Sequence, residues 1–205
     1  LVRGLEDAGV GACGKHFPGH GDTNLDSHLD LPVVSHDLRR LREVEWPPFK
    51  AAIDANVGAI MTAHVVMEAL DENHPATLAP KALQFLRDEL SFEGVIISDD
   101  LEMKAVADRY STKEMVELGM KAGVDHFLAC KEPKVVLELY RSIIRAVEEE
   151  TISHEDLLIK AKRVRKWRSR FYRPPVSPNE LKKVGCEEHQ LLAQEILTRK
   201  MMATS

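Results

Sequence analysis

The sequence predicts an α/β fold in which four parallel strands alternate with helices. A weak internal repeat is the first observation: a small or turn-forming residue and a valine introduce a short apolar run four times, at residues 8–10, 55–57, 93–95 and 122–124. Such runs, bounded by glycine, are typical of strands buried on both faces of a parallel sheet. Amphipathic helical patterns between the runs are the second observation, and they give successive β/α units with right-handed crossovers.

Helices are predicted from the spacing of apolar residues around these strands. They span residues 37–55 with a break at Trp46-Pro47-Pro48, then 80–90, 112–121, 133–149 and 154–171. Pro80 suits the first turn of its helix, and Ser111 is the expected amino-terminal cap of the next one. Residues 1–8 have the pattern of the end of a helix.

Composition excludes several classes of function. Hydrophobic residues make up 44% of the 205 residues and charged residues 30%, which is ordinary for a globular protein. The net charge of -5 argues against a dedicated nucleic-acid binder, and no stretch approaches the roughly 18 apolar residues of a membrane span. The basic run at residues 162–170 has helical spacing and is expected to be a solvated helix face. Three scattered cysteines form neither a zinc spacing nor a disulfide framework.

Polar side chains gather where the predicted strands end. Lys15 and His16 end the first strand, His64 follows the second, and Ser98, Asp99 and Asp100 end the third. The carboxyl ends of parallel strands form the catalytic face of a (β/α)8 barrel, and an open doubly wound sheet binds ligands at the same end. The pattern therefore predicts a site at this end without choosing between the two folds.

A long polar loop follows the first strand. Residues 15–28 contain three histidines, a lysine and two aspartates, and Pro18-Gly19 cannot continue a helix. One interpretation is a surface loop with its own turn bonds. A second is a metal site for zinc or iron, whose candidate ligands are His16, His20, Asp22, Asp26 and His28.

A third interpretation of this loop is a proton-transfer pair. Asp26 and His28 are two residues apart, so their side chains share one side of an extended backbone. A carboxylate at Asp26 can accept the Nδ1–H of His28, which fixes the tautomer and leaves Nε2 to carry a proton. The ordinary histidine pKa of about 6.5 suits acid–base exchange near neutrality.

A second cluster of acidic residues ends the third strand. Asp99 directly follows a buried apolar run, where a carboxylate costs free energy unless it is hydrogen-bonded or functional. Asp100 can instead cap the next turn with its side chain. The structural alternative is that both aspartates are caps.

Together these motifs resemble glycoside hydrolase family 3, and most closely its β-N-acetylglucosaminidase branch. The residues that carry the resemblance are Lys15-His-Phe-Pro-Gly-His-Gly-Asp-Thr, Asp26-Ser-His28, Met61-Thr-Ala-His64 and Gly94-Val-Ile-Ile-Ser-Asp-Asp-Leu-Glu-Met. The resemblance covers residues 1–171. It implies an α/β fold of parallel β/α units from a TIM-type (β/α)8 barrel, of which only about the last four units are present.

The resemblance also implies roles for individual residues. Asp99 matches the catalytic nucleophile, and His28 held by Asp26 matches the general acid and base. Lys15 and His16 match residues that bind the hydroxyls of N-acetylglucosamine. Support of the loop or pocket is expected from His20, Asp22, His64 and Met103. No metal or cofactor is implied.

The implied activity is retaining hydrolysis of terminal β-linked N-acetylglucosamine from peptidoglycan- or chitin-type fragments. The ligand is thus a saccharide rather than a nucleic acid. A β-glucosidase or phosphorylase of the same family, a metal-dependent hydrolase and an inactive sugar-binding fragment remain as alternatives. The compartment favoured is the bacterial cytoplasm.

Three segments are expected along the chain. Residues 1–172 form the carboxyl-terminal half of the barrel domain, 173–184 a proline-rich linker, and 185–205 a docking tail or the start of a second α/β/α domain. A four-stranded half cannot close, so its outer strands expose unpaired backbone. The expected partner is the missing amino-terminal half of the barrel.

Overall fold

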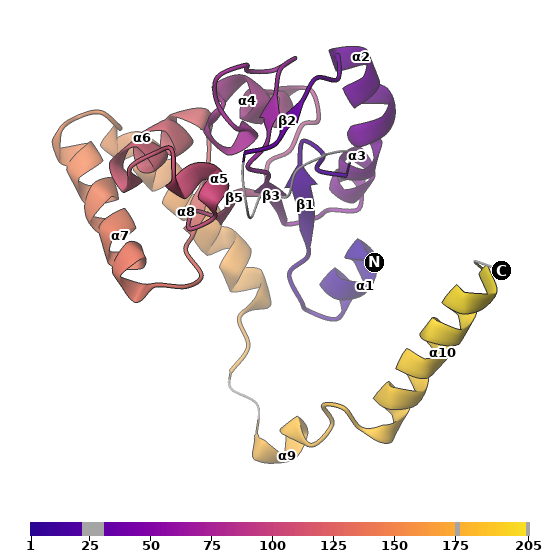
Figure 1. Ribbon diagram of the computed structural model, residues 1–205. Coiled ribbons are helices and arrows are strands. Elements are labelled where there is room, and N and C mark those ends of the chain that lie inside the picture. The colour runs from indigo at the N-terminus through magenta and orange to yellow at the C-terminus, as the bar shows by residue number, and fades with distance from the viewer. Residues whose placement is uncertain (22–30, 175–176, 204–205) are drawn as a thin grey trace. The chain divides into compact units, whose positions relative to one another are not determined.

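The computed structural model describes residues 1–21, 31–174 and 177–203 (Figure 1). The chain divides into two compact units, residues 1–171 and 172–205. The second unit contains the helices α9 (Pro178–Leu181) and α10 (Glu187–Ala203). Ser177 and Glu180 form a capping box at the start of α9. None of the described helices combines the length and apolar character needed to cross a bilayer.

A four-stranded parallel sheet organises the first unit. Its strands are β1 (Cys13–Phe17), β3 (Ala59–Thr62), β5 (Val95–Asp100) and β6 (His126–Leu128), in the order β1-β3-β5-β6. Cys13 pairs with Ala59, and Ala59 pairs with Val95. The sheet confirms the α/β prediction and places a strand after each of the four repeats.

The helices of the first unit follow the strands in alternation. They are α1 (Val2–Asp7), α2 (Leu38–Arg40), the π-helix η1 (Leu41–Glu45), α3 (Pro47–Asp54), the 3-10 helix η2 (Ala76–Leu78), α4 (Pro80–Asp88), α5 (Lys104–Ala107), α6 (Thr112–Ala122), α7 (Pro133–Glu148) and α8 (His154–Phe171). Ser111 caps α6 as predicted, in a capping box with Glu114. Trp46 separates η1 from α3, and its indole is buried against Phe85 with ring centroids 3.8 Å apart.

A second, two-stranded parallel sheet was not predicted. It pairs β2 (Val33–Val34) with β4 (Val66–Met67). Two-residue strands are too short to show an alternating pattern, so the sequence gives no signal for them. The pairing joins the segment after β1 to the segment after β3.

The two central strands are more deeply buried than the two outer strands. Ile60 of β3 and Ile96 of β5 belong to the main core, together with Phe49 of α3 and Leu83 of α4. Cys13 on β1 and His126 on β6 are exposed. The prediction of strands buried on both faces is therefore wrong for β1 and β6, because the sheet order leaves each with one strand neighbour.

Helix α8 lies against the amino ends of the strands. Its Val164 and Trp167 pack on a small cluster of Ala59, Val95 and Ile97. A Cβ atom at Gly58, directly before β3, would come within 2.3 Å of Trp167 Nε1, so only glycine allows this approach. The helix therefore covers the end of the sheet opposite to the predicted site.

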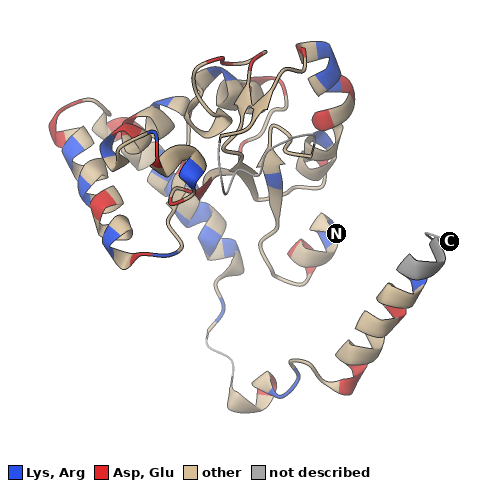
Figure 2. Cartoon of the chain, in the orientation of Figure 1, with Lys and Arg blue, Asp and Glu red and all other residues tan. Residues whose placement is uncertain are grey.

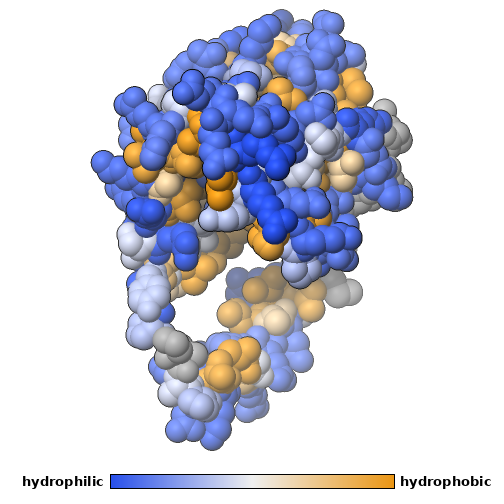
Figure 3. All heavy atoms as spheres, turned by 90° about the vertical axis from the view of Figure 1, so that its left-hand side faces the viewer, coloured by the Kyte–Doolittle hydropathy of each residue, from blue (hydrophilic) through white to orange (hydrophobic). Residues whose placement is uncertain are grey.

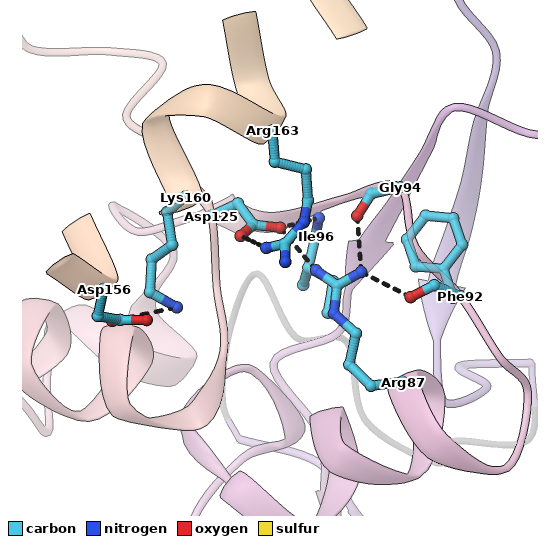
Figure 4. A network of polar contacts seen from close by, with 8 residues as sticks. All are labelled: Arg87, Phe92, Gly94, Ile96, Asp125, Asp156, Lys160 and Arg163. Atoms are coloured by element: carbon cyan, nitrogen blue, oxygen red, sulfur yellow. Dashed lines mark hydrogen bonds and ion pairs between the residues drawn. The ribbon is translucent and has the colours of Figure 1, made fainter. Parts of the chain in front are cut away.

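A buried ion network fixes α8 and α4 to this amino end (Figure 4). The Asp125 carboxylate is fully buried, and its Oδ2 accepts from Arg87 Nη2 at 2.7 Å and from Ile96 N at 2.8 Å. Arg163 of α8 donates to Oδ1. Arg87 Nη1 also donates to the carbonyl oxygens of Phe92 and Gly94, each at 2.7 Å.

The basic run of α8 is therefore not a solvated face throughout. Lysine and arginine residues line this helix (Figure 2), and several are exposed, such as Lys162 and Lys166. Arg163, however, pairs with buried Asp125, and Arg170 pairs with Glu6 at 2.9 Å. The expectation of a fully solvated face was wrong for Arg163 and Arg170, because nothing in a run of basic residues indicates which of them will pair with an acidic residue far away in the sequence.

The surface of the first unit is otherwise mixed. Figure 3 shows apolar side chains between hydrophilic ones on the face that it presents. Helix α7 contributes exposed Val136, Leu137 and Tyr140, whereas its Leu139 and Ala146 pack with Val116 and Met120 of α6. The spacing is that of an amphipathic helix on a packed layer.

We expect Asp125→Ala to destabilise the first unit strongly. The change leaves two guanidinium groups without their shared carboxylate and removes the acceptor of Ile96 N–H, which should lower the free energy of unfolding by about 3–5 kcal/mol. Urea denaturation measures this value. Asp54→Asn, which breaks the exposed Lys50–Asp54 pair, is the control and should cost less than about 1 kcal/mol. Equal effects of the two changes would contradict a structural role for the network.

Candidate active site

Two polar side chains meet at the carboxyl ends of β1 and β5. His16 Nε2 lies 3.7 Å from Asp99 Oδ2, and the two side chains are 27% and 18% exposed. Both groups thus remain partly accessible while facing each other. The strand between them, β3, ends at Thr62, so two segments separated by more than eighty residues form one site.

The neighbouring aspartates have different surroundings. Asp100 Oδ1 accepts from the backbone N–H of Glu102 at 3.1 Å and of Cys130 at 3.2 Å. Asp99 Oδ1 accepts from Asp100 N at 2.8 Å, while its Oδ2 faces His16. Asp100 therefore caps the following turn, as its position in the sequence suggested, and Asp99 is the aspartate that faces another strand.

Glu102 is a residue of this region that the sequence interpretation missed. Its two carboxylate oxygens accept from the backbone N–H groups of Lys131, at 2.6 Å, and Glu132, at 3.0 Å. Asp100 and Glu102 together hold the segment that leads from β6 into α7. No local pattern marks this contact, because the partners lie about thirty residues apart.

His64 lies beneath the site rather than on its surface. The residue is fully buried. Its Nδ1 is 2.9 Å from Thr77 Oγ1, and its Nε2 is 3.1 Å from the carbonyl oxygen of Asp100. Burial lowers the pKa of His64 below its usual value, although the negative charge of Asp99 acts in the opposite direction. The imidazole is therefore neutral near pH 7.

The start of the loop after β1 is anchored by packing. Phe17 is fully buried and meets the ring of Phe49 edge to face at 5.3 Å. At Gly19, which has φ of +129°, a Cβ atom would lie 2.8 Å from Cγ of Glu45. The loop can pass this close to η1 only with glycine at this position.

A cavity of about 580 Å³ lies beside this loop. Its lining includes Lys15, His16, His20 and Glu45. The rings of His16 and His20 are 6.0 Å apart at their centroids. Met103 is buried directly before α5.

Three of the expected site residues, Asp22, Asp26 and His28, lie outside the described residues. Within residues 1–21, 31–174 and 177–203, no three His, Cys, Asp or Glu side chains are grouped as a metal site would require. Of the described site residues, the structure brings His16 and Asp99 together at one end of the sheet, and Lys15 lines the neighbouring cavity with His16.

Residues 1–167 match the family model described as the glycosyl hydrolase family 3 N terminal domain. The chain belongs to glycoside hydrolase family 3. A protein of Nitrosomonas eutropha named beta-hexosaminidase is 37% identical over 158 residues, which are 75% of this chain and 45% of that protein. The chain spans less than half the length of this relative.

Solved structures give the same family. A family 3 β-N-acetylglucosaminidase from Paenibacillus sp. str. FPU-7 has a TM-score of 0.82 and 38% identity, over 86% of this chain and 35% of that one. Zinc-bound CbsA from Thermotoga neapolitana has a TM-score of 0.78 and 34% identity, over 82% and 38% of the two chains. The four parallel strands of this family 3 chain therefore belong to a TIM-barrel-like domain.

The burial of His64 predicts a pH-dependent stability. Because its pKa is lowered in the folded state, the unfolded chain binds more protons below about pH 6.5. The free energy of unfolding should therefore fall as the pH falls from about 6.5 toward the folded pKa, by at most about 1.4 kcal/mol per pH unit for this group. Urea denaturation from about pH 8 to 5 measures the slope.

His64→Gln should remove this contribution and flatten the profile. His126→Gln is the control: His126 is exposed overall, but partial desolvation of its ring and the charge of Arg168 also lower its pKa, so this change should remove only its own share. A His64→Gln profile with the wild-type slope would contradict the prediction.

Proposed function

We propose that the protein to which this chain belongs is a retaining β-N-acetylglucosaminidase that uses Asp99 as its nucleophile. The observation that carries the proposal is the contrast between two adjacent aspartates. Asp100 is occupied by backbone N–H groups, whereas Asp99 Oδ2 faces His16 at the open end of the sheet. Family membership and relatives named beta-hexosaminidase support a glycosidase.

In the proposed reaction, Asp99 Oδ2 attacks the anomeric carbon while the glycosidic oxygen takes a proton and leaves. Water then hydrolyses the glycosyl–Asp99 ester, and the configuration at the anomeric carbon is retained. Lys15 and His16, which line the same end of β1, bind hydroxyls of the sugar. Because Asp99 Oδ1 already accepts the N–H of Asp100, the carboxylate is oriented before the substrate arrives.

The proton donor in this proposal is His28, positioned by Asp26. Support comes from the motif and from family membership, since the structure does not describe these residues. A histidine near its ordinary pKa can give a proton to the leaving oxygen and then take one from the attacking water.

The partner in the proposal is an amino-terminal half-barrel. The sheet has four strands, and β1 and β6 are its outer members, whereas a TIM barrel has eight strands and no edges. The chain also spans only 38–45% of the length of three curated relatives named beta-hexosaminidase. Four further strands placed between β6 and β1 would close the sheet and complete the wall of the pocket.

Asp99→Asn and Asp100→Asn form a matched pair that tests the nucleophile. We expect Asp99→Asn to lower kcat by at least about 1,000-fold, because an amide does not form the covalent ester. Asp100→Asn should keep most of the activity, since the amide oxygen can still accept the two backbone N–H groups. The kcat of each variant is measured as release of nitrophenol from a nitrophenyl N-acetylglucosaminide. Each variant is assayed in the chain joined to an amino-terminal half-barrel.

Two additions to the same assay separate the alternative reactions. A chelator should leave the rate unchanged, whereas a metal-dependent hydrolase would lose activity. Added phosphate should yield no sugar phosphate, whereas a phosphorylase would produce it.

A fluorosugar inactivator should label Asp99, and wild-type activity in Asp99→Asn would refute the proposed nucleophile.

The effect of His28→Ala on kcat should depend on the leaving group of the substrate, if His28 donates the proton. Substrates with a good leaving group, such as nitrophenol, need little protonation, so their kcat should fall less than that of an N-acetylglucosamine disaccharide. His20→Ala, in the same loop, should lower the rates on both substrates by similar factors. Equal losses on both substrates in His28→Ala would argue against a proton donor at this position.

A further inference from the structure

We propose that His64 is a positioning residue for the nucleophile: its Nε2–H donates to the carbonyl oxygen of Asp100 and fixes the end of β5 from which the Asp99 carboxylate projects. The inference rests on the proposed role of Asp99. His64 is fully buried, so it acts through the backbone of β5 rather than by touching the sugar.

The first support is that Asp100 is held from several directions at once. Its N–H donates to Asp99 Oδ1 at 2.8 Å, and its Oδ1 accepts from Glu102 N and Cys130 N. Its carbonyl oxygen lies 3.1 Å from His64 Nε2. Asp100, the residue directly after Asp99, is thus connected to Asp99 on β5, to the segment after β6 and, through His64, to the segment that follows β3.

The second support is that the contact with a carbonyl oxygen favours one tautomer of His64. A carbonyl oxygen only accepts, so the proton of the neutral ring must be on Nε2, and Nδ1 must accept. Thr77 Oγ1 is 2.9 Å from Nδ1 and can donate to it. The same hydroxyl lies 3.1 Å from the carbonyl oxygen of Ala63, so its single proton is shared between these two acceptors.

Thr62 completes this arrangement. Its hydroxyl is 2.8 Å from Thr77 Oγ1 and can donate to it. Thr62, His64 and Thr77 are all fully buried. With the ring proton on Nε2, donation runs from Thr62 to Thr77, from Thr77 to both Nδ1 and the carbonyl oxygen of Ala63, and from Nε2–H to Asp100, among side chains that are shielded from bulk solvent.

The geometry has a direct consequence for the nucleophile. If the donor at Nε2 is removed, the carbonyl oxygen of Asp100 loses its imidazole partner in a partly buried site, and the end of β5 can shift to find another. Asp99 is bonded to the N–H of the same residue, so its carboxylate moves with it. A displacement of about 1 Å in a reacting group can reduce the rate about 100-fold.

The test compares His64→Leu with His64→Gln in the chain joined to an amino-terminal half-barrel. Leucine fills the site without a donor, whereas the amide nitrogen of glutamine can reach the position of Nε2. We expect kcat of His64→Leu to fall about 100-fold, with KM changed less than about 3-fold, because the sugar-binding groups are on β1. His64→Gln should recover kcat to within about 10-fold of wild type.

Leu86→Ala controls for loss of stability, because Leu86 is fully buried in α4 and belongs to the main core. It should lower the melting temperature at least as much as His64→Leu while leaving kcat within about 3-fold of wild type, since the change is away from the reacting groups. A fall in kcat for Leu86→Ala as large as that for His64→Leu would overturn the positioning role.

A measurement without turnover tests the tautomer in this chain. Nitrogen NMR of the histidine rings should show His64 neutral at pH 7 with its proton on Nε2, and Thr77→Val should perturb the Nδ1 resonance. A proton on Nδ1 would overturn the proposal, whether or not His64→Leu folds.

The activity results also separate this inference from the proposed function. If Asp99→Asn is inactive and His64→Leu has wild-type kcat, only the positioning role is overturned. If Asp99→Asn is active, the proposed nucleophile fails and the positioning role fails with it.

Discussion

The end of β5 is the feature on which the site depends, because the carboxylates of its two aspartates have different hydrogen-bond partners. The backbone and carboxylate of Asp100 are bonded to four separate groups. A strand end fixed in this way can present the preceding carboxylate, Asp99, in one direction toward β1. The contrast arises from packing, since the two residues are chemically identical and adjacent in the sequence.

The amino ends of the strands carry stabilising contacts, whereas the carboxyl ends carry the candidate site. At the amino ends, Asp125 joins α4, β5 and α8 in a buried ion network, and Trp167 packs against the start of the strands. At the carboxyl ends lie His16, Asp99 and the buried donors around His64. In TIM barrels stability features at the amino face and chemistry at the carboxyl face can vary independently. The rigid amino end thus supports an end where charged groups stay partly exposed.

Much of the fold could be predicted because its signals are local. The valine-led runs gave four strands, and Ser111 marked the start of α6 through a capping box. The short pair β2 and β4 carries no periodic signal, and Arg163 in a basic run gives no hint of Asp125 far away in the sequence. Within the site, the positions of Lys15, His16 and Asp99 at strand ends were accessible from pattern. Two features could not be predicted: the hydrogen bonds from the segment before α7 to Glu102, and the burial of His64. Both depend on tertiary contacts between residues 30 or more positions apart.

The location of the site also explains why an edge strand matters for its chemistry. Lys15 and His16 are on β1, which has β3 as its one strand neighbour in the sheet, whereas Asp99 is on a central strand. A saccharide bound across β1 and β5 would therefore extend beyond the edge of this sheet, where the described part of the chain places no further strand beside β1. Closing the barrel next to β1 would supply a wall on that side and would exclude water from the gap between His16 and Asp99. Lower water content strengthens every charge interaction there, so the proposed nucleophile gains its full effect only in the completed barrel.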